Sequence, residues 1–222
     1  FEEFQRFKLH PSIKSYFKNG KRISYGARAI NEGGLQSVPK LVFPGGCLIG
    51  CSAGFVNVPR IKGTHNAMKS GMLAAEAAFK QLSTNKEKTT PLLNDYDLSW
   101  KKSIIWKDLW KVRNVKPSLK WGLIFGNIHA GINMWLNDLG LGFLIPYTLK
   151  HKKPDHLSLI KASECKKIEY PKPDNAVSFS RTDSVFLAAT HHEENQPIHL
   201  VLSNNKTPID INLKDYNAPE QR

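Results

Sequence analysis

Cysteine is scarce in this 222-residue chain, and its scarcity excludes several kinds of site. Only Cys47, Cys51 and Cys165 are present, with no C-x-x-C pair and no nearby histidines that would complete a zinc site. An extended segment from Cys47 to Cys51 separates its ends by roughly 13 Å, which is too far for a disulfide. We therefore expect three free thiols and no metal ligands in the chain.

Acidic residues are also scarce, since 32 Lys and Arg against 19 Asp and Glu give a formal net charge of +13. A basic chain suits nucleic acid, an anionic membrane or an acidic protein as a partner. The sequence shows no helix-turn-helix, zinc finger or aromatic RNA-binding strand, so we expect no nucleic-acid partner. Its hydrophobic share of 41% and its five Trp suffice for a core.

A third absence is an unbroken apolar run of about 20 residues, the length that a membrane-spanning helix needs. Residues 121–147 are amphipathic instead. On a helix with about 100° per residue their large apolar side chains share one side, and the polar side chains fall on the other, namely Asn127, Asn133, Asn137 and Asp138. The apolar side consists of Trp121, Ile124, Phe125, Ile128, Ile132, Trp135, Leu136 and Leu139.

This helix has two interpretations. Packing on the protein's own core is the commoner one for amphipathic helices in general. Tryptophans on the apolar side are instead typical of a helix lying in the membrane interface, and residues 140–147 (GLGFLIPY) add more apolar surface than one core contact needs. We favour the membrane interface. Basic residues flank the segment: Lys111, Arg113, Lys116 and Lys120 precede it, and Lys150, Lys152 and Lys153 follow it.

A segment rich in small residues lies in the first half of the chain. Its apolar run Cys47–Ile49 predicts a short strand, Gly50–Gly54 a tight turn, and Gly63 and Thr64 a helix start with Thr64 as the N-cap. Such a strand, turn and helix start can bring backbone N–H groups against a polar ligand. Alternatively, the glycines only turn the chain in an ordinary strand-to-helix unit.

The helix predicted after this turn has a narrow face of mostly small residues that permits close approach. Its members are Ala67, Met68, Gly71, Ala74, Ala75, Ala78 and Leu82.

The ends of the chain give weaker patterns. Residues 1–11 carry aromatic side chains at positions 1, 4 and 7, which predicts a helix packed on a core. Residues 20–44 predict interrupted β-structure. Beyond Lys161 we expect short strands separated by prolines, including Ser184–Leu187, and we expect His191 and His192 to lie in a solvated loop rather than at a metal.

The string GCSAGFVNVPRIKGTHNAMKSG (residues 50–71) resembles the second flavin-contacting segment of FAD enzymes with the glutathione-reductase-like fold. Within that group it resembles the electron transfer flavoprotein–ubiquinone oxidoreductase family. The resemblance spans the chain in the family's order. It continues through YGARAINEGG (25–34), SVPKLVFPGG (37–46), YTLKHK (147–152), IEYPKPD (168–174) and DYNAPEQR (215–222).

The resemblance implies a mixed α+β and α/β fold, in which part of a glutathione-reductase-like FAD domain carries an inserted, membrane-associated quinone region and leads into a ferredoxin-like domain. It implies FAD and a [4Fe–4S] cluster as cofactors. Electrons would pass from electron transfer flavoprotein, through the cluster and FAD, to ubiquinone. The enzyme would be monotopic on the matrix face of the mitochondrial inner membrane, in contact with its lipid, and would need no acid–base catalyst here.

The same resemblance assigns FAD contacts to Gly50, Cys51, Ser52, Asn57, Gly63 and Thr64. Cys51 stands where many enzymes of this fold carry an Asp that accepts a hydrogen bond from a ribityl hydroxyl. A neutral thiol does not accept such a bond as a carboxylate does. We expect Ser52, Thr64 or backbone groups to make this contact instead.

The chain starts at Phe1, without a methionine or a targeting segment, and contains no G-x-G-x-x-G turn. The resemblance implies that the pyrophosphate-binding turn precedes Phe1 and that the cluster cysteines follow Arg222. It divides the chain into four parts: 1–45, a β-segment of the quinone domain that returns to the FAD domain; 46–90, the second flavin-contacting segment of the FAD domain; 91–153, the helical quinone and membrane-associated region; and 154–222, the start of the ferredoxin-like domain without its cysteines.

Two other functions fit these patterns. One is an FAD oxidoreductase similar to geranylgeranyl reductases, which also act on an isoprenoid substrate but have no ferredoxin module. The other is a basic membrane-surface protein without catalytic activity.

Overall fold

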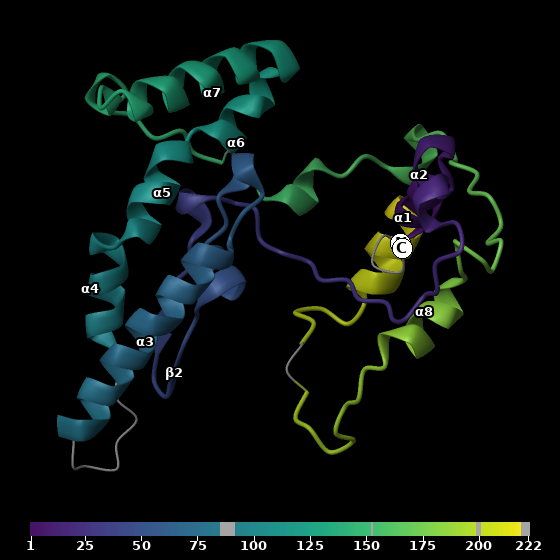
Figure 1. Ribbon diagram of the computed structural model, residues 1–222, viewed down its shortest axis with the longest axis horizontal. Coiled ribbons are helices and arrows are strands. Elements are labelled where there is room, and N and C mark those ends of the chain that lie inside the picture. The colour runs from purple at the N-terminus through teal and green to yellow at the C-terminus, as the bar shows by residue number, and fades with distance from the viewer. Residues whose placement is uncertain (85–91, 152, 199–200, 219–222) are drawn as a thin grey trace. The chain divides into compact units, whose positions relative to one another are not determined.

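The computed structural model describes residues 1–84, 92–151, 153–198 and 201–218 (Figure 1). The chain divides into two compact units. Residues 29–152 form the central unit, and residues 1–28 together with 153–222 form the terminal unit. These two units do not coincide with the four parts that we expect from the sequence. Residues 1–28 cluster with the C-terminal part of the chain, whereas residues 29–45 cluster with the central part.

The central unit is mostly helical. Its elements in chain order are η1 (Leu35–Ser37), β1 (Val42–Phe43), β2 (Gly46–Cys47), η2 (Gly50–Ala53), η3 (Val58–Arg60), α3 (Thr64–Thr84), α4 (Asn94–Lys102), α5 (Ile104–Val112), α6 (Val115–Ser118), η4 (Leu119–Trp121), α7 (Leu123–Asp138) and η5 (Gly142–Leu144). The boundary that we expect after residue 90 lies outside the described residues.

Within the described residues, β1 and β2 are the only strands, and they form one antiparallel hairpin that pairs Val42 with Cys47 and Phe43 with Gly46. Gly45 makes the turn with φ 81°, a conformation that glycine adopts without steric cost. The β-structure expected across residues 20–44 is therefore reduced to these short strands, and the strand expected at Cys47–Ile49 ends at Cys47. The reason is that glycines and prolines interrupt the run before a longer ladder can form.

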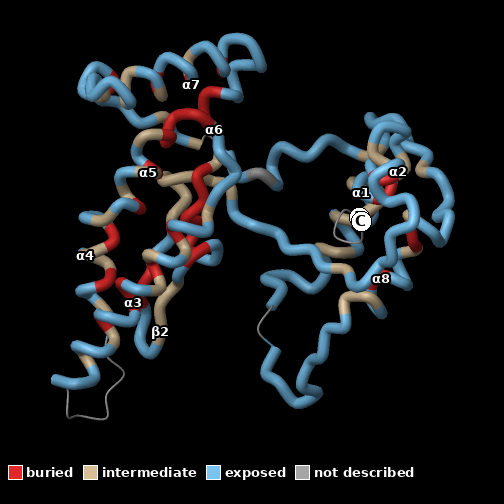
Figure 2. The backbone as a smooth tube through the Cα atoms, viewed as in Figure 1, coloured by how far each residue is buried: buried red, intermediate tan, exposed pale blue. Residues whose placement is uncertain are grey.

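The core of the central unit lies between the hairpin, η2 and helices α3 to α5 (Figure 2). Its buried members are Leu41, Val42, Ala53, Phe55, Leu73, Ala74, Ala77, Tyr96, Trp100, Ile105 and Leu109. The Tyr96 hydroxyl donates a hydrogen bond to the Leu48 carbonyl at 2.9 Å, which ties α4 to the chain after the hairpin. Burial raises the pKa of Tyr96 to about 12, which keeps this hydroxyl protonated, and therefore a donor, even in moderately alkaline solution.

Helix α3 confirms the helix predicted after Gly63, but its buried face differs from the expected one. The buried residues are Asn66, Ser70, Leu73, Ala74 and Ala77. Met68 and Leu82, which we expected on the packed face, are 67% and 69% exposed. The helix is apolar on more than one side, so its periodicity does not reveal which side faces this core.

The terminal unit contains α1 (Glu2–Leu9), α2 (Pro11–Phe17), η6 (Asp155–Ser158), η7 (Ala162–Glu164), α8 (Arg181–Ala188), η8 (Thr207–Leu213) and α9 (Lys214–Tyr216). A cluster of edge-to-face rings joins Phe1, Tyr25 and Phe179, with centroids 5.5–6.0 Å apart. The helix expected at the N-terminus is confirmed. Its Phe4 and Phe7 are about half exposed, so the packing role predicted for them is held by Phe1 alone.

Residues 184–187 lie in helix α8, so the strand predicted for them is wrong. A reciprocal capping box starts this helix, in which the Ser180 hydroxyl accepts from the Asp183 amide and the Asp183 carboxylate accepts from the Ser180 amide. The spacing S-x-x-D signals such a helix start in the sequence and outweighs the local β-branched and aromatic residues. His191 and His192 are exposed and outside regular structure, as expected.

Candidate functional site

Element η2 packs directly on the first two turns of α3. The Gly50 amide donates to the Ser70 hydroxyl at 2.9 Å, and that hydroxyl donates to the Ala67 carbonyl at 2.7 Å. Gly50 has φ 58°, and a Cβ there would lie 3.1 Å from the Ala67 Cβ, so glycine permits both the turn and the close approach. Cys51 and Ser52 follow on the exposed side of η2.

The loop between η2 and α3 is closed on itself. Asn57 and Lys62 exchange two backbone hydrogen bonds of 2.9 and 3.3 Å. The Gly63 carbonyl then accepts the first helical hydrogen bond, from the Ala67 amide at 2.8 Å. Gly63 therefore occupies the N-cap position, and Thr64 is the first helical residue rather than the cap that we predicted. Thr64 is exposed.

The start of α3 can accept a polar or anionic group. The amides of Thr64, His65 and Asn66 precede the first intrahelical hydrogen bond, and the first turn contains no acidic residue. The structure therefore brings most of the predicted small-residue site together around one helix start. Asn57, like Gly50, is buried, and its side chain points into the protein.

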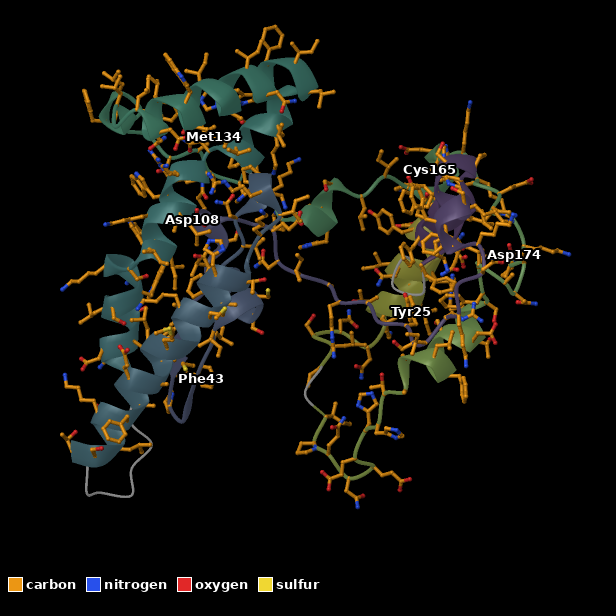
Figure 3. The ribbon with its side chains drawn as sticks, in the orientation of Figure 1. Tyr25, Phe43, Asp108, Met134, Cys165 and Asp174 are labelled. Carbon is orange, nitrogen blue, oxygen red and sulfur yellow. The ribbon has the colours of Figure 1, made fainter. Side chains whose placement is uncertain are left out.

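Asp108 on α5 is a residue of this region that the sequence did not single out (Figure 3). Its Oδ1 accepts from Asn57 Nδ2 at 2.8 Å, and its Oδ2 accepts from Asn66 Nδ2 at 2.9 Å. His65 Nε2 lies 3.1 Å from the same Oδ2. An isolated acid within a basic helix was the available signal, but nothing in its spacing points to residues about 50 positions earlier.

Helix α7 presents its large apolar side chains outward. Of the residues predicted for that side, Trp121 precedes α7 in η4, Leu139 follows it, and Leu136 is partly buried. The exposed members are Trp121 (51%), Ile124 (72%), Phe125 (73%), Ile128 (55%), Ile132 (52%), Trp135 (62%) and Leu139 (55%). In η5, Phe143 and Leu144 are exposed by 71% and 57%.

The opposite face of α7 is small and polar, and it packs on the protein. Its buried residues are Gly126, Ala130 and Asn133. A Cβ on Gly126 would lie 2.7 Å from the Ser118 carbonyl oxygen, so α7 touches the end of α6 backbone to backbone. Asn133 is fully buried, and Asn137 Nδ2 donates to its carbonyl at 2.7 Å. Of the predicted polar side, these two asparagines therefore lie toward the core.

Buried Arg113 fastens the chain that follows η5. Its guanidinium donates to the carbonyls of Trp110, Ile145 and Tyr147 and to the Thr148 hydroxyl, at 2.7–3.2 Å. It also stacks on the Trp110 ring, with 4.0 Å to the centroid. Burial lowers the pKa of Arg113. This clamp holds α7 and η5 as one layer on α5 and α6.

A shallow hollow of about 510 Å³ opens beside η5. It is lined by Trp110, Arg113, Asn137, Gly140, Gly142, Phe143, Ile145 and Pro146.

The described residues contain no group of three or more His, Cys, Asp and Glu placed to hold a metal ion. All three cysteines are free, with Cys47 partly buried and Cys51 and Cys165 exposed, as expected. Across the described ranges, no helix is both long enough and apolar enough to cross a membrane.

Two family models match the chain. Residues 1–30 match a model described as "ETF-QO, ubiquinone-binding", and residues 175–222 match one described as "Electron transfer flavoprotein-ubiquinone oxidoreductase, 4Fe-4S". Curated relatives carry the name electron transfer flavoprotein-ubiquinone oxidoreductase, mitochondrial. The Rattus norvegicus protein is 53% identical, the Homo sapiens protein 52% and the Caenorhabditis elegans protein 48%, each over 100% of this chain.

These matches all fall within one class, the oxidoreductases. Over its whole length the chain is similar to part of the electron transfer flavoprotein–ubiquinone oxidoreductases. It spans 36% of the length of the rat and human relatives and 37% of the nematode one.

Proposed function

We propose that this chain forms part of an enzyme that carries electrons from reduced electron transfer flavoprotein, through a [4Fe–4S] cluster and FAD, to ubiquinone. Residues 1–45 and 91–153 would serve the quinone domain, 46–90 the FAD domain, and 154–222 the start of the ferredoxin-like domain. The similarity over the whole chain and the names of the relatives support this activity. Their mitochondrial designation supports a place on the inner membrane, for which we propose a monotopic, matrix-facing attachment.

The outward apolar face of α7 and η5 is the observation that carries the proposal. Apolar patches of this extent on soluble monomers are uncommon and mark binding surfaces. The large apolar side chains of α7 lie on its exposed side, because small residues and a buried asparagine occupy the side that packs on the protein. We propose that this face enters the lipid interface and that the hollow beside η5 borders the entrance for the quinone.

The residues at the start of α3 fit a flavin. Backbone amides without helical partners and an exposed hydroxyl at Thr64 can bind the polar atoms of the ring and its ribityl chain, while Gly50 and Gly63 allow the turn and the loop to pack closely around the helix start. FAD supplies the electron-carrying ring when bound, while these residues bind it, orient it and set its electrostatic surroundings. We propose Gly50, Cys51, Ser52, Asn57, Gly63 and Thr64 as this contact segment.

The described residues do not fit an iron–sulfur cluster. Cys165 is the one cysteine in the terminal unit, whereas such clusters need four ligands, usually cysteines. The match to the 4Fe-4S model covers residues 175–222, which contain no cysteine at all. We propose that the ligands belong to parts of the enzyme beyond this chain.

Membrane binding by the full-length enzyme tests the proposal. Full burial of a Leu- or Ile-sized side chain contributes roughly 1.5–3 kcal/mol. We expect Ile128→Ser, Ile132→Ser and Trp135→Ser together to weaken co-sedimentation with liposomes at least tenfold, because each factor of ten needs about 1.4 kcal/mol.

Leu98→Ser is the matched control, since Leu98 is exposed by 58% on α4, away from the proposed face. It should bind vesicles like the parent enzyme. A folded triple variant that binds vesicles as well as the parent would show that α7 faces other protein.

A further inference from the structure

The carboxylate of Asp108 connects two segments that are distant in sequence. It accepts hydrogen bonds from Asn57 at one end of the loop and from Asn66 in the first turn of α3, and it contacts His65. Of the residues proposed to contact the flavin, Gly63 and Thr64 lie between these two anchors, and Asn57 is itself one of them. Both ends of the loop are therefore held by the same carboxylate on α5.

The two asparagines are oriented specifically toward this carboxylate. Asn57 and Asn66 are 1% and 0% exposed, and the Oδ1 atom of each has no hydrogen-bond partner among the described residues. Buried amide oxygens without partners are costly. The Asp108 carboxylate explains this orientation. Both side-chain NH₂ groups donate to it, and turning either amide around would place the amide oxygen against the carboxylate.

Among the residues that the structure describes, every hydrogen bond to the Asp108 carboxylate comes from a side chain. An acidic residue at a helix start ordinarily binds the free backbone amides itself. Asp108 instead leaves the amides of Thr64, His65 and Asn66 available to a ligand, while its negative charge remains near them. This charge opposes the addition of electrons to a neighbouring group.

The same helix supports the membrane-facing layer. Val112, one turn beyond Asp108 on α5, packs with Val115, Ala130 and Met134 beneath α7. Asp108 is thus the point at which the start of α3 is attached to the helix that carries α7.

We propose that Asp108 is a positioning residue for the flavin, holding the start of α3 in place and keeping the flavin's reduction potential low. This inference rests on the proposed function. Asp108 acts through Asn57, His65 and Asn66 rather than by touching the cofactor.

The test is the flavin midpoint potential of the full-length enzyme, measured by redox titration of the flavin absorbance. Asp108→Asn removes the charge and cannot accept from all its donors, so the potential should rise. Asp108→Glu keeps the charge and both acceptor oxygens and should restore a potential near that of the parent. An unchanged potential in folded, flavin-loaded Asp108→Asn overturns the inference.

Asp95→Asn is the matched control. Asp95 also connects α3 to a neighbouring helix, through Lys80 at 2.6 Å, but at the far end of α3. It should leave the potential unchanged. A rise equal to that of Asp108→Asn would mean that loss of any carboxylate that contacts α3 suffices, even one far from the helix start, which would also overturn the inference.

A double-mutant cycle with Thr64→Ala separates positioning from general electrostatics. If Asp108 acts by placing the helix start, its effect on the potential should shrink once Thr64 has lost its hydroxyl. Additive shifts would contradict positioning. Asn66→Ala, which removes one donor, replaces Asp108→Asn in the cycle if that variant does not fold. A parent enzyme that contains no flavin would overturn the proposed function instead.

Discussion

The side chain of Asp174 (labelled in Figure 3) organises the loop before α8 by accepting hydrogen bonds from backbone amides of that loop. Its Oδ1 accepts from the amides of Ala176, Val177 and Ser178 at 2.8–3.1 Å and from the Ser178 hydroxyl at 3.0 Å. These hydrogen bonds hold the pKa of Asp174 far below its ordinary value of 3.8, and the bond from the Ser178 amide has the largest effect. The folded loop therefore favours the ionised carboxylate.

We expect this loop to lose stability in acid. A depressed folded pKa stabilises the fold fully above the unfolded pKa, and this contribution declines as the pH falls below about 4. Asp174→Ala should weaken protection of amides 176–178 by roughly 1–2 kcal/mol at neutral pH, as when other capping side chains are removed.

Hydrogen exchange of the full-length enzyme, followed by mass spectrometry at several pH values, measures this effect. The difference between parent and variant should narrow in acid. Asp210→Ala, at an exposed aspartate of η8, is the control and should not alter these amides. A difference that stays constant down to pH 3 would contradict the role assigned to the carboxylate.

At single residues, the sequence located the helix start near Gly63 correctly because glycine spacing and capping are local properties. It misplaced the cap by one residue, since Gly63 and Thr64 are both accepted at that position. It could not reveal Asp108, because the contacts of Asp108 depend on how α5 packs against α3. The buried orientation of Asn57 likewise follows from tertiary packing.

At the scale of elements, α7 depends on one close approach. Gly126 leaves no room for a side chain, since a Cβ would lie 2.7 Å from the Ser118 carbonyl oxygen and 2.8 Å from the Leu119 Cα. Gly131 in the same helix has no atom within 4 Å of the corresponding position. The two glycines therefore offer a comparison within one element.

Gly126→Ala should destabilise the attachment of α7 by about 1–3 kcal/mol, because backbone atoms must move to admit the methyl group. Gly131→Ala should leave it unchanged or stabilise it by up to about 1 kcal/mol, since alanine favours helix. Hydrogen exchange across residues 123–138 in the full-length enzyme compares the variants. Equal effects of both substitutions would show that α7 does not pack closely on α6.

Helices were predicted better than strands. The amphipathic pattern in residues 121–139 is long and regular, so it identified α7 and its exposed side. In residues 20–44 the apolar residues are few and glycines separate them. No pattern could therefore show that the described part of this segment contains a single strand of two residues, β1. Residues 184–187, for which we wrongly predicted a strand, show that a capping box can determine whether a short segment becomes a helix.

At the scale of the whole molecule, positive charge is distributed unevenly. Residues 29–152 contain 16 Lys and Arg against seven Asp and Glu, whereas the other 98 residues contain 16 against 12. The unit that carries the apolar face thus also carries most of the net charge. Each basic residue near an anionic lipid surface contributes about 1 kcal/mol.

Salt should therefore weaken, but not abolish, binding of the full-length enzyme to anionic liposomes. Screening removes the lysine contribution, since the Debye length falls to about 3 Å at 1 M salt, whereas apolar burial persists. Binding to neutral phosphatidylcholine vesicles should be weaker at low salt and nearly independent of salt. Complete release from anionic vesicles at 1 M salt would show that the apolar face does not insert.

The distribution of tryptophan gives the chain an optical consequence. Trp100 is 4% exposed in the core, and Trp106 and Trp110 stack with centroids 5.7 Å apart. Trp121 and Trp135 lie on the apolar face around α7 and are more than half exposed. Indole emission moves to shorter wavelengths when water is replaced by hydrocarbon. The apolar face therefore contains its own fluorophores, and quenchers placed at known depths in a bilayer would report whether this face is immersed, without any attached label.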